Sequence, residues 1–81
     1  MRKNYTDLKE LINHIAQEIK NTRISKNMTI EELSIKSNIS VRYLKSVENA
    51  RISKISIKSL CKICNALNTN IYNIIVKNRF D

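Results

Sequence analysis

The sequence predicts an all-α fold of five short helices in one small domain. Neither glycine nor proline occurs among its 81 residues. Because tight β-hairpin turns depend on glycine, this absence argues against a β-sheet fold. Apolar residues recur at three- and four-residue steps in several segments, which is the period of a helix with one buried face. No segment alternates apolar and polar residues over the length of a strand. Serine, threonine and asparagine must therefore mark where the helices begin and end.

The first helix is predicted over residues 7–24, with Thr6 as its N-cap. Its apolar residues lie three or four positions apart and form one stripe: Leu8, Leu11, Ile12, Ile15 and Ile19. Residues 1–14 are expected to form an N-terminal extension that continues into this helix. The main domain is expected at residues 15–76, followed by a C-terminal tail at residues 77–81.

A second, short helix is predicted to begin after Thr29, whose hydroxyl can cap it, and to stop near residues 37–38. The acidic residues in its first turn favour the positive end of the helix dipole. Its apolar contacts are expected from Ile30, Leu33 and Ile35.

A tight turn is predicted at Asn38, before a third helix. Such a turn joins two helices at a steep angle and needs one residue with positive φ, which asparagine tolerates because its side chain is short and polar. Ile39 can then enter the core. The third helix is predicted from Ser40, its N-cap, to about residue 49, with Leu44 and Val47 facing inward.

The remaining apolar residues predict two further helices. A fourth helix follows Ser56, and its inward-facing residues are Ile57, Leu60, Ile63, Cys64 and Leu67. A fifth, short helix is predicted at about residues 70–77 and carries Ile71, Ile74, Ile75 and Val76.

The charge balance favours a polyanionic partner. Fifteen lysines and arginines against seven acidic residues give a formal net charge of +8, which creates a strong field around so small a body. A soluble protein that is basic without such a partner is the alternative. No run reaches the ~18 apolar residues of a membrane span. The charged N-terminus does not resemble a secretion signal, so we expect a cytoplasmic protein that binds no membrane.

Neither an enzyme site nor a metal site is expected. Cys61 and Cys64 form a C-x-x-C pair, but a structural zinc site wants four ligands, and the sequence offers only the distant His14 besides them. At a spacing of three on a helix, the cysteines fit better as small core or boundary residues. No pair of nucleophile and base is visible, and His14 is expected to be solvated. We predict no catalytic residue, no cofactor and no small-molecule ligand.

The third helix carries a polar face without an acidic residue. Leu44 and Val47 define its buried side, and at 100° per residue four polar residues gather on the opposite side: Arg42, Lys45, Ser46 and Asn49. Val41 and Tyr43 flank this face, and Glu48 points back toward the core. Such side chains bond phosphates and base edges, and a helix fits the major groove of DNA. A merely solvated face is the alternative.

Several motifs occur in the order found in one family of DNA-binding domains. They are Arg23, Met28-Thr29-x-Glu31-Glu32-Leu33, Ser37-Asn38-Ile39-Ser40, Leu44-x-x-Val47-Glu48, Leu60-x-x-Ile63-x-x-Ala66-Leu67 and Asn70-Ile71-x-x-Ile74. With this ordered set, the stretch from about residue 15 to residue 75 resembles the Cro- and phage-repressor-type helix-turn-helix family. Tyr43 and the segment at residues 55–60 also resemble the controller proteins of restriction-modification systems.

The resemblance implies a five-helix helix-turn-helix DNA-binding domain. It implies that Arg23 and Glu48 form a partly buried ion pair between the first and third helices, and that loss of one partner costs about 3–5 kcal/mol. It also implies that bases are read at Val41, Arg42, Tyr43, Lys45 and Ser46. Arg42 is the leading base reader, since its guanidinium can bond O6 and N7 of guanine, and Val41 could touch a thymine methyl.

Phosphate contacts are expected on both sides of the third helix. Thr29 and the free amides at the start of the second helix suit one DNA strand. The loop before the fourth helix suits the other strand, with Asn49, Arg51, Ser53 and Lys54. Simple solvation of these residues is the alternative.

The sequence departs from the family pattern at two positions that bear on these contacts. The family commonly has glutamine where Ile30 stands and glycine where Ala50 stands. Ile30 cannot form a hydrogen bond through its side chain but could pack against Val41. If φ is positive at Ala50, alanine costs about 1 kcal/mol there, unless Asn49 takes that role.

The late apolar cluster exceeds what so small a core needs and is a candidate dimer face, with Tyr72, Ile74, Val76 and Phe80 as its residues. The alternative is that the fifth helix only closes the core. A homodimer would place two third helices about 34 Å apart on a palindromic operator.

The leading hypothesis is a dimeric, sequence-specific regulator of transcription that binds double-stranded DNA. We expect a repressor or autoregulator from a bacterial mobile element or restriction-modification system. An antitoxin is a related alternative. A protein-interaction module that kept the fold without reading DNA is another, and Ile30 and Val41 favour it. The operator sequence and the sign of regulation stay open.

Overall fold

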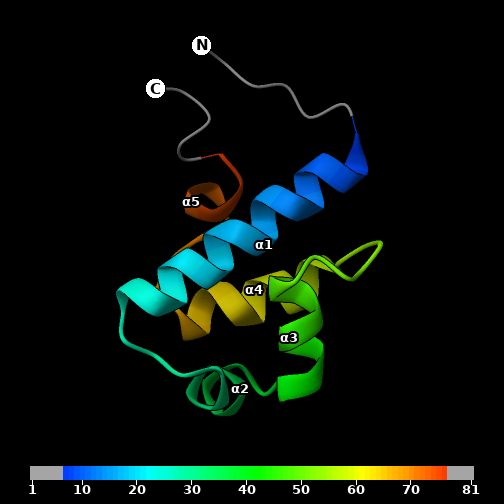
Figure 1. Cartoon of the computed structure of the whole chain (residues 1–81). Helices are drawn as coiled ribbons and strands as arrows, with labels where there is room; N and C mark the ends of the chain where they lie inside the picture. The colour runs from blue at the N-terminus through cyan, green and yellow to red at the C-terminus, as the bar shows by residue number, and fades with distance from the viewer. Residues whose placement is uncertain (1–6, 77–81) are drawn as a thin grey trace.

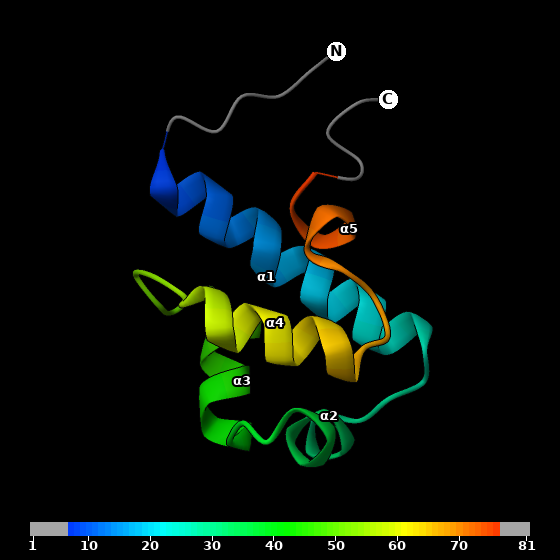
Figure 2. The same cartoon turned by 180° about the vertical axis from the view of Figure 1, so that it is seen from behind.

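The computed structural model describes residues 7–76 and confirms the all-α prediction, because this part of the chain forms five helices and no strand. The helices are α1 (Leu8–Ser25), α2 (Ile30–Ser37), α3 (Val41–Glu48), α4 (Ile57–Ala66) and α5 (Ile71–Ile75). Figure 1 and Figure 2 show α5 at one end of the molecule, α1 and α4 in the middle, and α2 and α3 at the other end.

One apolar core joins the five helices. Its buried cluster consists of Ile15, Ile19, Leu33, Leu44, Val47, Leu60, Ile63, Cys64, Leu67 and Ile74. Within the described chain, α4 packs on α2 and α5, and α1 packs on α3 and α5. Full burial of an aliphatic side chain of this size contributes about 1.5–3 kcal/mol, so this cluster is the main force that holds α2 and α3 to the rest of the domain.

Each helix begins at a polar side chain that accepts a hydrogen bond from an amide of the first turn. For the four later helices these N-caps are Thr29, Ser40, Ser56 and Asn70. For α1 the prediction of Thr6 was wrong, because Asp7 is the N-cap and its carboxylate accepts a bond from the amide of Lys9 at 2.9 Å. Aspartate caps a helix at least as well as threonine does.

The first four helices end in the same way, although the chain has no glycine. A residue with φ between 54° and 59° follows each of them, at Asn27, Asn38, Ala50 and Asn68. The next amide then donates to the carbonyl five residues earlier, as in the bond from Arg51 to Ser46 at 2.8 Å. This is the Schellman arrangement. The predicted turn at Asn38 is confirmed, and after α3 it is Ala50, not Asn49, that takes the positive φ.

Three residues that the helical period assigns to an apolar stripe lie on the surface instead. Leu8 is 57% exposed, Ile35 is 82% exposed and Ile57 is 68% exposed. Ile35 lies two positions after the buried Leu33, and two residues that far apart on a helix point to roughly opposite sides. Ile57 is the first residue of α4, so it lies at the edge of the packed face of this helix.

Candidate nucleic-acid interface

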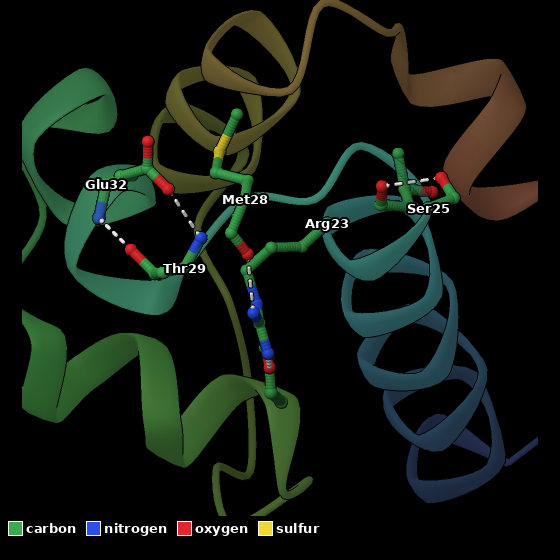
Figure 3. Close-up of polar contacts among 7 residues, drawn as sticks. Arg23, Ser25, Met28, Thr29 and Glu32 are labelled. Carbon is green, nitrogen blue, oxygen red and sulfur yellow. Dashed lines mark hydrogen bonds and ion pairs between the residues drawn. The ribbon is translucent and has the colours of Figure 1, made fainter.

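A capping box holds the start of α2. The hydroxyl of Thr29 accepts a hydrogen bond from the amide of Glu32 at 3.0 Å, and the carboxylate of Glu32 accepts one from the amide of Thr29 at 2.8 Å (Figure 3). Hydrogen bonding to Thr29 lowers the pKa of Glu32 below its usual value, and the bond from the backbone amide of Thr29 is the largest cause. Two amides at this helix start are thus already bonded within the box, which leaves fewer donors for a phosphate than the sequence suggests.

The turn between α2 and α3 is compact. Asn38 adopts the left-handed conformation with φ 59° and ψ 37°. Ile39 packs against the core, and its carbonyl accepts a bond from the hydroxyl of Ser34 at 2.6 Å. Ser37 is buried at the end of α2, where a larger side chain would push the turn outward. These contacts fix the direction in which α3 leaves α2.

The polar residues of α3 lie on the side away from the core. Leu44 and Val47 are buried, whereas Arg42 and Lys45 are exposed. Ser46 is half-buried, and its hydroxyl donates to the carbonyl of Arg42 at 3.2 Å. Two long cationic side chains, one turn apart, therefore extend from the same surface of the helix.

Val41 and Tyr43 lie at the border between this surface and the core. Both are half-buried, and Tyr43 packs against the buried cluster. The structure thus brings all five predicted base-reading positions onto one short helix, but their side chains differ in how far packing restrains them. The ring of Tyr43 is partly held by packing, while Arg42 and Lys45 extend into solvent.

The predicted phosphate contacts lie on two sides of α3. Thr29 is exposed just before α2, and the exposed residues that follow α3 are Asn49, Arg51, Ser53 and Lys54. No acidic residue occurs between positions 49 and 56. By contrast, Glu31 and Glu32 expose negative charge directly beside Thr29. The loop after α3 is therefore electrostatically better suited to a phosphate than the start of α2, a difference that sequence reasoning missed.

The ion pair that the resemblance implied is present in the structure. Nε and Nη2 of Arg23 donate to the two carboxylate oxygens of Glu48 at 2.7 and 3.0 Å, and Nη1 donates to the carbonyl of Met28 at 2.8 Å (Figure 3). The two charged side chains are only 15% and 5% exposed. Hydrogen bonding to Glu48 raises the pKa of Arg23. The pair ties α1 to α3 and to the segment before α2, so it sets the orientation of α3.

The carbonyl of Met28 is a partner that sequence reasoning did not find. A backbone acceptor leaves no mark in the order of side chains, since every residue has one. The bond requires that the chain after α1 turn back toward Arg23, and the positive φ of 54° at Asn27 allows this turn. An asparagine shortly after the end of a predicted helix was the available signal.

The predicted dimer face is only partly available on the surface. Tyr72 is 62% exposed and Val76 is half-buried, but Ile74 is only 1% exposed and belongs to the core cluster. The assignment of Ile74 to a dimer face was therefore wrong, because α5 uses this side chain to close the core of its own chain. Phe80 lies outside the described residues.

The cysteines are free thiols, with Cys61 half-buried and Cys64 buried. Burial raises the pKa of Cys64 to about 11, so its thiol stays protonated at neutral pH. Residues 7–76 contain no group of three histidine, cysteine or carboxylate side chains that could hold a metal ion. His14 is half-buried rather than solvated, so that prediction was wrong. None of the helices in the described part of the chain is long and apolar enough to cross a membrane.

Comparison with known proteins agrees with this geometry. A family model described as helix-turn-helix matches residues 19–73, a stretch that runs from within α1 to within α5 and contains the whole α2–α3 unit. No curated protein matches the chain closely enough to count as a relative.

Solved structures of a gene regulator and of a restriction-modification controller protein have a similar arrangement. ClgR, the clp gene regulator of C. glutamicum, is 26% identical with a TM-score of 0.76, and the match covers 82% of this chain and 84% of that one. The restriction-modification controller protein C.Esp1396I is 28% identical with a TM-score of 0.73, over 89% of this chain and 86% of that one. A nucleoprotein complex of C.Esp1396I matches at 31% identity and a TM-score of 0.76, over 88% and 95% of the two chains.

Proposed function

The chain belongs to the helix-turn-helix family, and on that premise we propose that it regulates transcription by placing α3 in the major groove of double-stranded DNA. The observation that carries this proposal is the electrostatics of α3. Its one acidic residue, Glu48, is turned inward and paired with Arg23, while Arg42 and Lys45 extend outward. A helix that removes its negative charge from an exposed cationic surface is suited to approach phosphates and base edges.

Sequence recognition in this proposal depends chiefly on Arg42. The residue is exposed and lies in the first turn of α3, and in helices of this motif the N-terminal residues contact the bases. Its guanidinium can donate two hydrogen bonds to O6 and N7 of one guanine, which is worth about 1–3 kcal/mol of discrimination. Lys45 and Ser46 follow within one turn, and Val41 offers an apolar contact to a thymine methyl. Tyr43 contributes as a packed residue at the edge of the groove.

Phosphate contacts in this proposal come mainly from the loop after α3. Arg51 and Lys54 supply positive charge there, and Asn49 and Ser53 supply neutral hydrogen-bond donors. Thr29 provides a weaker contact on the other strand, since Glu31 and Glu32 expose negative charge directly beside it. The formal net charge of +8 adds a field that draws the chain toward DNA from a distance.

Two copies of the chain are expected to bind one palindromic operator. One helix of eight residues reaches few base pairs, so specific binding at physiological salt requires a second recognition helix about 34 Å away. The solved relatives include a clp gene regulator and a restriction-modification controller. We propose that this chain is a repressor or autoregulator of a mobile element or restriction-modification system, and the likeness to the controller protein supports the second of these.

The test is a fluorescence-anisotropy titration of the duplex upstream of the chain's own gene and of a scrambled duplex of equal composition. Wild type is expected to prefer the upstream duplex, and log K should fall with log salt by about 0.9 for each phosphate neutralised. Arg42→Ala is expected to lose that preference. Lys20→Ala, which removes one exposed positive charge from α1, is the matched control and should keep it.

Equal, weak binding of both duplexes by wild type would contradict sequence recognition at this promoter. In that case a protein-interaction module or an antitoxin becomes the better assignment, and binding to its partner would depend little on salt. Loss of preference in Lys20→Ala to the same degree as in Arg42→Ala would show that total charge, rather than α3, determines binding.

A further inference from the structure

A polar hollow lies between the second half of α1 and the segment that leads from α4 into α5 (Figure 2). Its volume is about 440 Å³, which is enough for a small ligand. All the described residues that line it are polar: Glu18, Asn21, Thr22, Ser25, Lys26, Asn68, Thr69 and Asn73. None of them is among the residues proposed to contact DNA, so the DNA surface does not account for this hollow.

The side chains of the hollow offer both hydrogen-bond donors and acceptors. The amide nitrogen of Asn73 donates to the hydroxyl of Thr69 at 3.2 Å, so its carboxamide oxygen is left as an acceptor. The carboxamide oxygen of Asn21 accepts a bond from Gln17 at 3.4 Å, so its amide nitrogen is left as a donor. A carboxamide carries the same donor and acceptor groups as a peptide bond. The hollow is therefore suited to a ligand with a peptide backbone.

The lining is poorly suited to nucleotides and sugars. No aromatic side chain lies among its described residues to stack on a base or a sugar ring. A phosphate group would meet the carboxylate of Glu18 and the negative end of the α1 dipole. Glu18 and Lys26 carry opposite charges and the other lining residues are neutral. A ligand without net charge therefore fits better than an anion or a cation.

The dimensions of the hollow limit the length of such a ligand. Its α1 wall runs from Glu18 to Ser25, which is about 10 Å because a helix rises about 1.5 Å per residue. An extended peptide rises about 3.3 Å per residue, so about three residues match this wall. Glu18 lies at one end of the wall, and Lys26, the exposed C-cap of α1, lies just beyond the other. Opposite charges at the two ends suit the charged termini of a free peptide.

We propose that this hollow binds a short extended peptide with free termini, with its ammonium group toward Glu18 and its carboxylate toward Lys26. The carboxamides of Asn21, Asn68 and Asn73 bond its backbone, so binding depends on peptide groups and termini more than on the peptide's side chains. The proposal runs against the expectation from the sequence that the chain binds no small-molecule ligand. It goes beyond the proposed function and does not depend on it.

The test is a titration of the nitrogen-15-labelled whole chain with trialanine, followed by backbone amide NMR shifts. The changes are expected to saturate in the millimolar range or below, and to centre on Thr22, Ser25, Asn68 and Asn73 with little change in α3. Trialanine with an acetylated N-terminus and an amidated C-terminus is expected to bind at least about tenfold more weakly. A lack of saturable changes around the hollow would overturn the proposal. Equal binding of the capped peptide would overturn the role of the two charged ends.

Two matched pairs of variants locate the binding site. Lys26→Gln and Lys20→Gln each remove one exposed positive charge, but only Lys26 lines the hollow. Asn21→Ala and Asn13→Ala each remove one exposed carboxamide from α1, but only Asn21 lines the hollow. Because all four side chains are exposed, thermal unfolding should show that the variants stay folded.

The variant at the hollow is expected to weaken trialanine binding about tenfold in the lysine pair and severalfold in the asparagine pair. The control of each pair is expected to bind as wild type does. Equal weakening by both lysine variants would show that total charge determines binding and would overturn the proposal. Unchanged binding in both Lys26→Gln and Asn21→Ala would also overturn it, because the peptide would then bind elsewhere.

Discussion

Ala50 occupies a backbone conformation that residues with a Cβ avoid. Its φ is 55°, and the other three left-handed positions, at φ values of 54°, 59° and 55°, are asparagines. Asparagine tolerates this region because its short polar side chain can bond locally, whereas alanine has no such compensation. The Schellman bond from Arg51 to Ser46 holds Ala50 in place. The end of α3 therefore carries a small local strain.

Ala50→Gly is expected to stabilise the domain by about 0.5–1 kcal/mol, because relief of the left-handed strain exceeds the entropy that glycine adds to the unfolded chain. Urea unfolding followed by circular dichroism measures the difference. Ala16→Gly, in the middle of α1, is the control and should lower the free energy of unfolding by about 1 kcal/mol or more. A destabilising effect of Ala50→Gly would show that φ at this position is not the source of strain.

Sequence reasoning was least accurate in predicting which single residues are exposed. The helical period correctly placed Leu44, Val47 and Leu60 inside, because a helix with neighbours on one side buries one stripe. It failed for Leu8, Ile35 and Ile57, whereas the wrong assignment of Ile74 to a dimer face came from the size of the late apolar cluster. A period gives the direction of a side chain but not whether a neighbouring helix covers it, and that depends on where each helix ends.

Helix boundaries were predictable because polar caps mark them. The hydroxyls of Thr29, Ser40 and Ser56 each cap the helix expected from them. At α1 the neighbouring Asp7 took the place of the predicted Thr6. Two adjacent residues of good capping ability cannot be separated by local propensity alone.

The capping box makes the stability of α2 depend on pH. Because hydrogen bonds from Thr29 lower the pKa of Glu32 below 4.5 in the folded chain, the folded state favours the ionised carboxylate. Its contribution to stability is therefore present above about pH 4.5 and is lost as the pH falls through the lower folded pKa.

Glu32→Gln is expected to reduce this loss, since glutamine can still accept the bond from the amide of Thr29 but does not titrate. The measurement is the urea midpoint of wild type and variant from neutral pH to well below pH 4.5. Glu31→Gln removes the neighbouring carboxylate outside the box and serves as the control. Identical acid profiles for wild type and Glu32→Gln would mean that the box contributes no pH-dependent stability.

The ion pair between α1 and α3 makes the two helices depend on each other. Removal of either Arg23 or Glu48 leaves its partner's charge largely buried, so Arg23→Met and Glu48→Leu are each expected to cost about 3–5 kcal/mol. The double variant should lose much less than the sum of the two, since no unpaired charge remains. Equilibrium unfolding of all four proteins forms the cycle. Additive losses would contradict a direct coupling through the pair.

At the scale of the whole molecule, the helices that form the supporting layer differ from those proposed to lie against DNA. Helices α1 and α4 form the middle layer, α5 closes one end, and α2 and α3 form the other end (Figure 1). The order of motifs predicted this fold, because each motif fixes one helix and the short connections leave few ways to pack them. The hollow between the start of α1 and the loop after α3 was not predictable, since it forms between residues that lie far apart in sequence, such as Leu8 and Ala50.

The central claim is that α3 is the DNA-binding surface, and a map of backbone amide NMR shifts tests it most directly. The nitrogen-15-labelled chain is titrated with the duplex upstream of its gene. The largest shift changes should fall within Val41–Glu48 and in the following loop to Lys54, with smaller ones near Thr29 and little change in α5. Changes centred on α5, with α3 unperturbed, would contradict the assignment of α3 as the DNA-binding helix.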